Sequence, residues 1–231
     1  MQNSLFALLL IFCCFPVGAQ QAVEEEQLGS WYMYFFNKSF KEGRFGLQGD
    51  LQYRGWNAGG DLEQLLLRSG LTYRPENTSV MLTLGYADIT SGAFGDNNST
   101  TGERRLYQEA LLPQKIIDRI LLTHRFRYEQ RFVDGQDFRT RYRYNIFANV
   151  LLNKAVLEKQ TLYLALYNEI FINGQTGIGD GRNVQRFDRN RTYIGLGYGL
   201  KDNLRIQVGW MRQTTVNWGK NQAQFSLHHA W

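Results

Sequence analysis

Cysteine is nearly absent from this chain of 231 residues, and both of its cysteines, Cys13 and Cys14, lie in an apolar N-terminal run. The run is roughly 11 residues long, too short to span a bilayer as a helix, and small residues follow it up to Ala19. We therefore predict that residues 1–19 are a signal peptide cleaved after Ala19. The mature chain would then lack cysteine, which excludes disulfides, thiolate metal sites and a cysteine nucleophile. An acylated lipoprotein cysteine is disfavoured, because Phe12 and Cys13 are not the small residues expected before it.

Long apolar runs are also missing after residue 19, which excludes a helical membrane protein. Proline occurs only three times, whereas glycine occurs 23 times and aromatic residues make up 14% of the chain. Outer-membrane barrels have this low hydropathy, because only every second residue of a strand faces lipid.

The charge balance is basic, with a formal net charge of +5. Such a balance favours contact with the phosphates of lipopolysaccharide, or a lumen that attracts anions. The arginines alternate with aromatic residues instead of clustering on a helix or loop in a familiar motif, so nucleic acid is not an expected partner.

The clearest pattern lies between Arg119 and Asn153, where one alternation occurs twice around a turn at 133–136. Successive side chains of a strand point to opposite faces, so one face is charged and the other aromatic. The Asp-Gly pair in the turn tolerates the positive backbone angles of a tight reversal. The pattern predicts a long hairpin whose charged face carries Arg125, Arg127, Glu129, Arg131, Arg139, Arg141 and Arg143.

The predicted strands are about twice the five or six residues common in soluble sandwiches, and transmembrane barrel strands need about 9 to 11. We therefore predict an all-β chain that forms a single antiparallel transmembrane β-barrel at 30–231, preceded by an acidic lead-in at 20–29. Short periplasmic turns should alternate with longer extracellular loops, of which 89–104 and 174–190 are the main candidates. The fifth strand is expected to end at Pro113, because proline cannot donate to a ladder. Counting gives about eleven segments, but bacterial single-chain barrels have even strand numbers, so we expect one miscounted segment and a total of 10–12 strands.

The last strand ends on an aromatic residue. Every second residue back from Trp231 is expected to face lipid, including Leu227 and Phe225. This pattern is similar to the C-terminal signal by which the barrel assembly machinery inserts such proteins. It predicts export through the periplasm to a bacterial outer membrane, with outer-membrane lipid and lipopolysaccharide as partners.

Four phrases together resemble one known family. They are His124-Arg-Phe-Arg-Tyr-Glu-Gln-Arg-Phe132, Arg139-Thr-Arg-Tyr-Arg-Tyr144, Tyr167-Asn-Glu-Ile-Phe-Ile-Asn173 and the long segment 193–211. In order and spacing, with Leu62-Glu-Gln-Leu65 and the closing strand, they resemble the outer-membrane barrels catalogued as domain of unknown function 2490. The resemblance implies a fold and a location, and it brings no activity, ligand or catalytic residue.

The candidate functional feature is the charged row. Inward arginines would meet Glu129, Glu109 and Glu169 as cross-strand pairs and fill a narrow lumen as a polar core. That reading makes the protein a structural or interaction barrel whose two long loops meet other molecules. The alternative is a small passive channel for anionic solutes, because inward arginines exceed inward glutamates on the two hairpin strands.

Few residues in this sequence are candidates for catalysis. Ser226 and His228 should share the inward face of the last strand, roughly 7 Å apart along the strand. They make an outer-membrane lipid hydrolase a distant alternative, but sequence gives no third group to orient the imidazole. His124 is expected to be an outward interfacial aromatic, and no metal-like spacing of histidines and carboxylates occurs. We therefore expect no enzyme activity, no metal and no cofactor.

Overall fold

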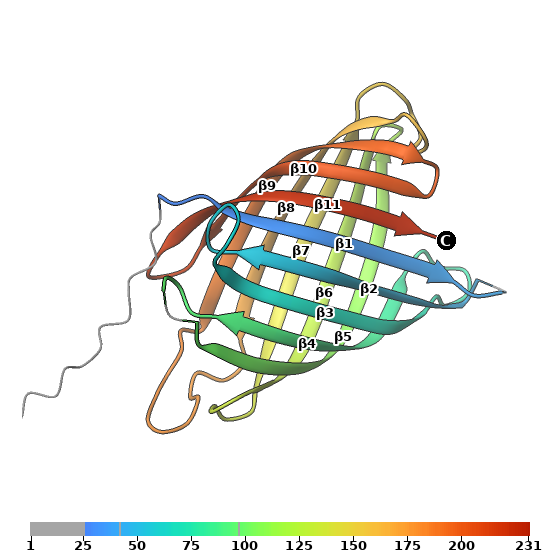
Figure 1. Cartoon of the computed structure of the whole chain (residues 1–231). Helices are drawn as coiled ribbons and strands as arrows, with labels where there is room; N and C mark the ends of the chain where they lie inside the picture. Colours follow the sequence, from blue (N-terminus) through green and yellow to red (C-terminus); the bar gives the residue numbers. More distant parts are fainter. Residues whose placement is uncertain (1–25, 42, 97) are drawn as a thin grey trace, which may run out of the picture.

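The computed structural model describes residues 26–41, 43–96 and 98–231, and this part of the chain contains eleven strands and no helix. The strands close into one barrel in which neighbours in sequence are neighbours in space (Figure 1). Their bounds are β1 Gly29–Ser39, β2 Phe45–Gly55, β3 Leu62–Tyr73, β4 Met81–Gly92, β5 Thr100–Ile117, β6 Ile120–Val133, β7 Arg139–Leu151, β8 Leu162–Asn173, β9 Phe187–Lys201, β10 Leu204–Thr214 and β11 Gly219–Ala230.

The predicted signal peptide and most of the acidic lead-in lie outside the described residues. β1 begins at Gly29, which is the last residue of the predicted lead-in. No helix in the described ranges is long and apolar enough to cross a membrane.

The barrel closes through a parallel pair. β1 and β11 run side by side in the same direction, with Gly29 opposite Gln222 and Asn37 opposite Ala230 (Figure 1). The expectation of an even strand number was therefore wrong, and the eleven segments were counted correctly. Closure requires only that the two edge strands exchange backbone hydrogen bonds, which a parallel ladder also provides.

The two ends of the barrel carry different sets of connections. We call the loop end the one with connections 56–61, 93–99, 134–138, 174–186 and 215–218, and the turn end the one with 40–44, 74–80, 118–119, 152–161 and 202–203. The predicted contrast in length is modest, because only 174–186 is clearly longer than every connection at the turn end. Both predicted loops are wrong in their bounds. In 89–104, β4 extends to Gly92 and β5 begins at Thr100, and in 174–190, β9 already begins at Phe187.

Pro113 does not end β5, contrary to the sequence-based expectation. It pairs with Thr123 of β6 inside an 18-residue strand. Its carbonyl faces the β4 side and accepts a hydrogen bond from Ser79 Oγ (3.4 Å). Ser79 precedes β4, which begins at Met81. A strand residue directs its N–H and C=O to the same side, so the N–H that proline lacks would have met no ladder partner there.

The hairpin of β6 and β7 has the predicted turn and faces. Gly135 has a φ of +68°, and Gln136 N donates to Val133 O (3.1 Å) across the turn. On the outer face, aromatic rings pair across the strands, with centroid distances of 4.9 Å for Phe126 and Tyr144 and 5.2 Å for Tyr128 and Tyr142. The charged side chains therefore all point into the barrel.

Outside and inside differ sharply in chemistry along the whole barrel. The outer face exposes large apolar side chains, including Leu67, Leu84 and Ile194, whereas most buried side chains of the lumen are polar or charged. An eight-stranded barrel is about filled by ordinary side chains, so eleven strands leave more space to occupy. Arginine and tyrosine side chains occupy much of it. Gly85 leaves room for the ring of Tyr107, because a Cβ there would overlap the ring.

Candidate functional site: the arginine-rich lumen

Glu129 lies at the centre of the charged lumen and is 1% exposed. Its carboxylate accepts hydrogen bonds from Arg141 Nε and Nη2 (2.8 and 2.7 Å) and from Arg143 Nη1 (2.7 Å). Guanidinium groups of Arg105 and Arg127 lie within 3.8 and 3.9 Å. One carboxylate thus holds four arginines together, and it offsets the repulsion between Arg127 and Arg143, which are directly opposite each other on β6 and β7.

The other carboxylates of this region also bind more than one arginine. Glu103 pairs with Arg105 (2.6 Å) and Arg131, Glu169 pairs with Arg125 (2.7 Å) and Arg143 (2.6 Å), and Asp188 pairs with Arg141 (2.7 Å) and Arg189 (3.2 Å). Glu109 accepts from Arg127 Nε (2.6 Å) and from Gln48 Nε2 (2.8 Å), and Arg125 Nε lies 3.8 Å from its carboxylate. Charge-assisted bonds of this kind are the strong class of hydrogen bond, and sharing each carboxylate links β5 to β9 into one network.

All nine residues predicted for the charged row lie inside the barrel, and eight of them take part in these ion pairs: Arg125, Arg127, Glu129, Arg131, Arg141, Arg143, Glu109 and Glu169. Arg139 is the exception. It is 6% exposed, and within the described residues its guanidinium has no ion pair and its Nε no hydrogen-bond partner.

Sequence reasoning missed two carboxylates of the network, because both were assigned to loops. Glu103 could have been found, since Glu103, Arg105, Tyr107 and Glu109 continue a single alternation. Asp188 has no such signal. The pairing of β8 and β9 shifts register between Phe171 and Ile172, so Asp188 has no partner in that ladder. It reaches Arg141 from this irregular position.

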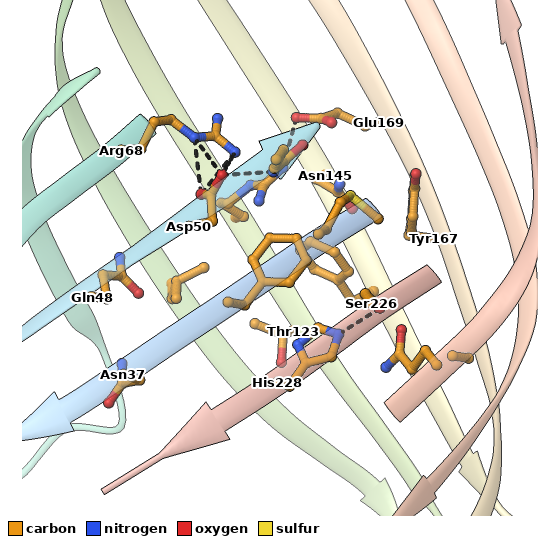
Figure 2. A pocket seen from close by; sticks show the side chains of 18 of the residues that line it. Asn37, Gln48, Asp50, Arg68, Thr123, Asn145, Tyr167, Glu169, Ser226 and His228 are labelled. Atoms are coloured by element: carbon orange, nitrogen blue, oxygen red, sulfur yellow. Dashed lines mark hydrogen bonds and ion pairs between the residues drawn. The ribbon is translucent and has the colours of Figure 1, made fainter. Parts of the chain in front are cut away.

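Positive charge exceeds negative charge inside the barrel. Among the described residues, ten arginine and lysine side chains are buried against six carboxylates. Asp50 and Arg68 form a further close pair, which is bidentate, with Nε and Nη2 of Arg68 at 2.9 Å from the carboxylate oxygens (Figure 2). The surplus falls mainly near Trp31, where Arg54 and Arg191 lie over the indole ring.

A cavity of about 400 Å³ lies mostly in the half of the lumen nearer the turn end. Its inner end reaches Trp31 and Arg54, near the loop end of β1 and β2. Figure 2 shows part of its lining. Its walls include Asn37, Met81 and Leu111, which lie near the strand ends at the turn end. Its inner part is lined by arginines of the network. The lumen therefore has a filled half near the loop end and a hollow half near the turn end.

Ser226 and His228 lie on the inner face of β11 at the edge of this cavity, closer together than the strand rise suggested (Figure 2). Ser226 Oγ and His228 Nε2 are 3.1 Å apart, because the two side chains lean toward each other. The imidazole stacks on Phe35 at a centroid distance of 4.8 Å. In the described part of the chain no carboxylate contacts His228, so the pair lacks the acidic group that orients the base of a hydrolytic triad.

The remaining predicted positions lie on the outside or concern metals. His124 faces outward, with Nδ1 at 2.8 Å from the Tyr144 hydroxyl. Phe225 and Trp231 are exposed on the outer surface near the closure, where Phe225 stacks on Tyr32, and Leu227 is partly buried. No cluster of histidine and acidic residues suited to a metal ion occurs in the described residues.

A comparison with curated proteins finds no match to this chain. A family model described as a protein of unknown function (DUF2490) matches residues 28–224, which includes all of β1 to β10 and the first half of β11. The match covers nearly the whole barrel, including the charged strands. The chain therefore belongs to the DUF2490 family.

Proposed function

We propose that this protein is a bacterial outer-membrane barrel with a structural or interaction role, whose lumen is closed by its arginine and carboxylate network. The observation that carries the proposal is the burial of that network. Glu129, Arg141 and Arg105 are 1%, 4% and 5% exposed. The lining of a water-filled pore would be accessible to water, so side chains this buried indicate a filled cross-section.

The apolar outer face supports the membrane location. Exposed large side chains occur on every strand from β2 to β4 and from β8 to β11, among them Leu71, Leu84 and Leu196 at more than half of their full exposure. Soluble monomers rarely expose so continuous an apolar surface, whereas a barrel in lipid requires it. Outer-membrane lipid and lipopolysaccharide are then its surroundings, and residues 1–19 would direct export through the periplasm to the barrel assembly machinery.

The loop end is the place where such a barrel would meet other molecules. The 174–186 connection is held by its own bonds, with Arg182 N donating to Gly179 O (2.9 Å) and Asp137 N donating to Ile178 O (3.0 Å). A loop ordered in this way presents a defined surface, which suits recognition.

Planar-bilayer conductance of the refolded chain tests the proposal. A change in gel mobility on boiling first establishes that the barrel is folded. We expect the folded protein to give no steady conductance steps. Steady anion-selective steps would contradict the closed lumen and favour the second candidate, a passive channel for anionic solutes, which the excess of buried arginines supports.

A folded chain that remains in the aqueous phase when mixed with lipid vesicles would contradict the membrane location. Hydrolysis of lipid is not favoured, because no acidic group orients His228 among the described residues. Loss of a lipid-hydrolysing activity in Ser226→Ala with unchanged gel mobility would reverse that conclusion.

A further inference from the structure

The cavity in the hollow half of the lumen has a strongly positive lining. Seven arginines line it, but only three carboxylates do, namely Asp50, Glu109 and Glu169. Each of these carboxylates is already engaged by an arginine: Asp50 by Arg68, Glu109 by Arg127 and Glu169 by Arg143. The excess positive charge therefore has no counterpart in the cavity wall.

Arg191 is the most exceptional member of this lining. It is 6% exposed, and its one polar contact in the described residues is from Nε to Gln213 Oε1 (2.7 Å). Glu169 is its direct cross-strand neighbour, but the Glu169 carboxylate turns to Arg125 and Arg143. Both Nη groups of Arg191 thus remain available to a ligand in the cavity.

Arg54 lies over the same indole ring. Its Cζ is 3.8 Å from the Trp31 ring centre, and that of Arg191 is 4.7 Å from it. Arg54 donates only to neutral amide oxygens, at 2.6 Å to Gln52 and 2.7 Å to Gln64. The neighbouring carboxylate, Glu63, accepts instead from the Trp31 ring nitrogen (2.9 Å).

Two guanidinium groups without a carboxylate partner, beside one aromatic ring and a cavity, make a built anion site. A guanidinium does not lose its proton under ordinary conditions, so this excess charge cannot be removed by titration. Burying unpaired charge is costly, and a bound anion would offset that cost. Guanidinium forks match the oxygens of carboxylate and phosphate groups.

The rest of the cavity indicates what the anion carries. Toward the turn end the lining includes the apolar side chains of Met33, Phe35 and Phe147 among polar ones. We propose that the cavity binds an organic anion, with its phosphate or carboxylate group between Arg54 and Arg191 and its apolar or aromatic body toward Met33, Phe35 and Phe147. The ligand enters from the turn end. This inference goes beyond the structural role proposed above and requires the closed barrel but not the membrane.

Calorimetric titration of the refolded full chain with phenylphosphate tests this site. We expect saturable binding with one molecule per barrel, and weaker binding of inorganic phosphate, which lacks the ring. Gln213→Glu places a carboxylate beside Arg191 without changing volume, and we expect it to weaken phenylphosphate binding at least about tenfold, which corresponds to about 1.4 kcal/mol. Arg191→Gln should weaken it similarly.

Arg119→Gln is the matched control, because Arg119 is exposed at the turn end and donates only to Leu152 O (2.9 Å). Its affinity for phenylphosphate should equal that of the unchanged chain. No saturable heat from the folded protein would overturn the proposal, as would unchanged affinity in folded Gln213→Glu. Equal affinities for phenylphosphate and inorganic phosphate would overturn the assigned position of the apolar body. If Arg191→Gln does not fold, Gln213→Glu still decides, since it removes no side-chain atoms beyond the amide nitrogen.

Discussion

The two sides of the lumen bury arginine in different ways. Across β5 to β7, arginines meet carboxylates at hydrogen-bond distance, as Arg141 and Arg143 do at Glu129. Around Trp31, Arg54 and Arg191 meet amide oxygens and an aromatic face instead. The arginine side chains are almost inaccessible to solvent on both sides, so the difference is in how the charge is compensated.

This difference separates a structural region from a binding region. A carboxylate neutralises an arginine and fixes it in place, which suits a plug. An amide oxygen accepts a hydrogen bond from a guanidinium and an indole face packs against it, but neither neutralises its charge. That charge remains available to an anionic ligand. Removing a carboxylate from the network should therefore lower the free energy of unfolding, whereas adding one beside Trp31 should raise it.

The largest effect is expected for Glu129→Ala. It removes the carboxylate that holds Arg141 and Arg143, and breaking a buried ion pair by removing one partner costs about 3–5 kcal/mol. We expect a loss of this size in the free energy of unfolding, measured in denaturant by loss of the heat-sensitive gel mobility. A loss below about 1 kcal/mol would mean that the arginines find other partners, and the plug would not depend on this residue.

A second comparison lies within the arginine and carboxylate network itself. Arg143→Gln breaks bonds to Glu129 and Glu169, so it should lower the free energy of unfolding by about 3 kcal/mol or more. Arg139→Gln removes a buried cation without an ion pair in the described residues and should leave stability unchanged or higher. The two variants have the same chemistry and strand, and equal losses in the same denaturant measurement would refute the role given to pairing.

The opposite sign is expected on the Trp31 side. Gln213 is fully buried, and its Nε2 has no hydrogen-bond partner in the described residues. Gln213→Glu removes that unsatisfied donor and gives Arg191 a carboxylate, so it should raise the free energy of unfolding by about 1–3 kcal/mol. The gain should disappear when Arg191→Gln is combined with it. A gain that persists in the double variant would show that Arg191 is not its source.

The smallest effect is expected outside the barrel wall. Lys154 and Glu158 form an ion pair (2.9 Å) in the 152–161 connection, where Glu158 is exposed and Lys154 partly exposed. Glu158→Ala removes the same residue type as Glu129→Ala, but exposed pairs contribute only about 0–1 kcal/mol. Its unfolding curve in denaturant should nearly overlay that of the unchanged chain. A loss comparable to that of Glu129→Ala would show that the loss of stability does not depend on the burial of the ion pair.

Alternation in the sequence was sufficient to predict the faces of the strands. A strand residue has only two directions available, so Arg127 and Glu129 were correctly expected inside and Phe225 outside. The charged row was predictable for the same reason. The actual pairing was not, because it depends on register between strands, which alternation within one strand does not determine.

The errors have local causes. Pro113 was expected to end a strand, but on the side where its N–H would lie no neighbouring strand is present, so no ladder bond is lost. Asp188 lies at a register shift, which breaks the two-residue period. The role of Trp31 could not be inferred either, since Arg54 and Arg191 reach it from β2 and β9, far apart in the sequence.

The parallel closure of β1 with β11 has a consequence for rearranging the chain. Gly29 lies at the loop end and Trp231 at the turn end, and the eight residue steps from Gly29 to Asn37 separate these two ends along the barrel. At the rise of a strand this is roughly 26 Å. In a barrel with an even number of strands a short linker can join the first strand to the last and allow a circular permutation. Here the linker would have to run the length of the wall or thread the lumen, so a permuted chain with a short linker cannot reproduce this fold.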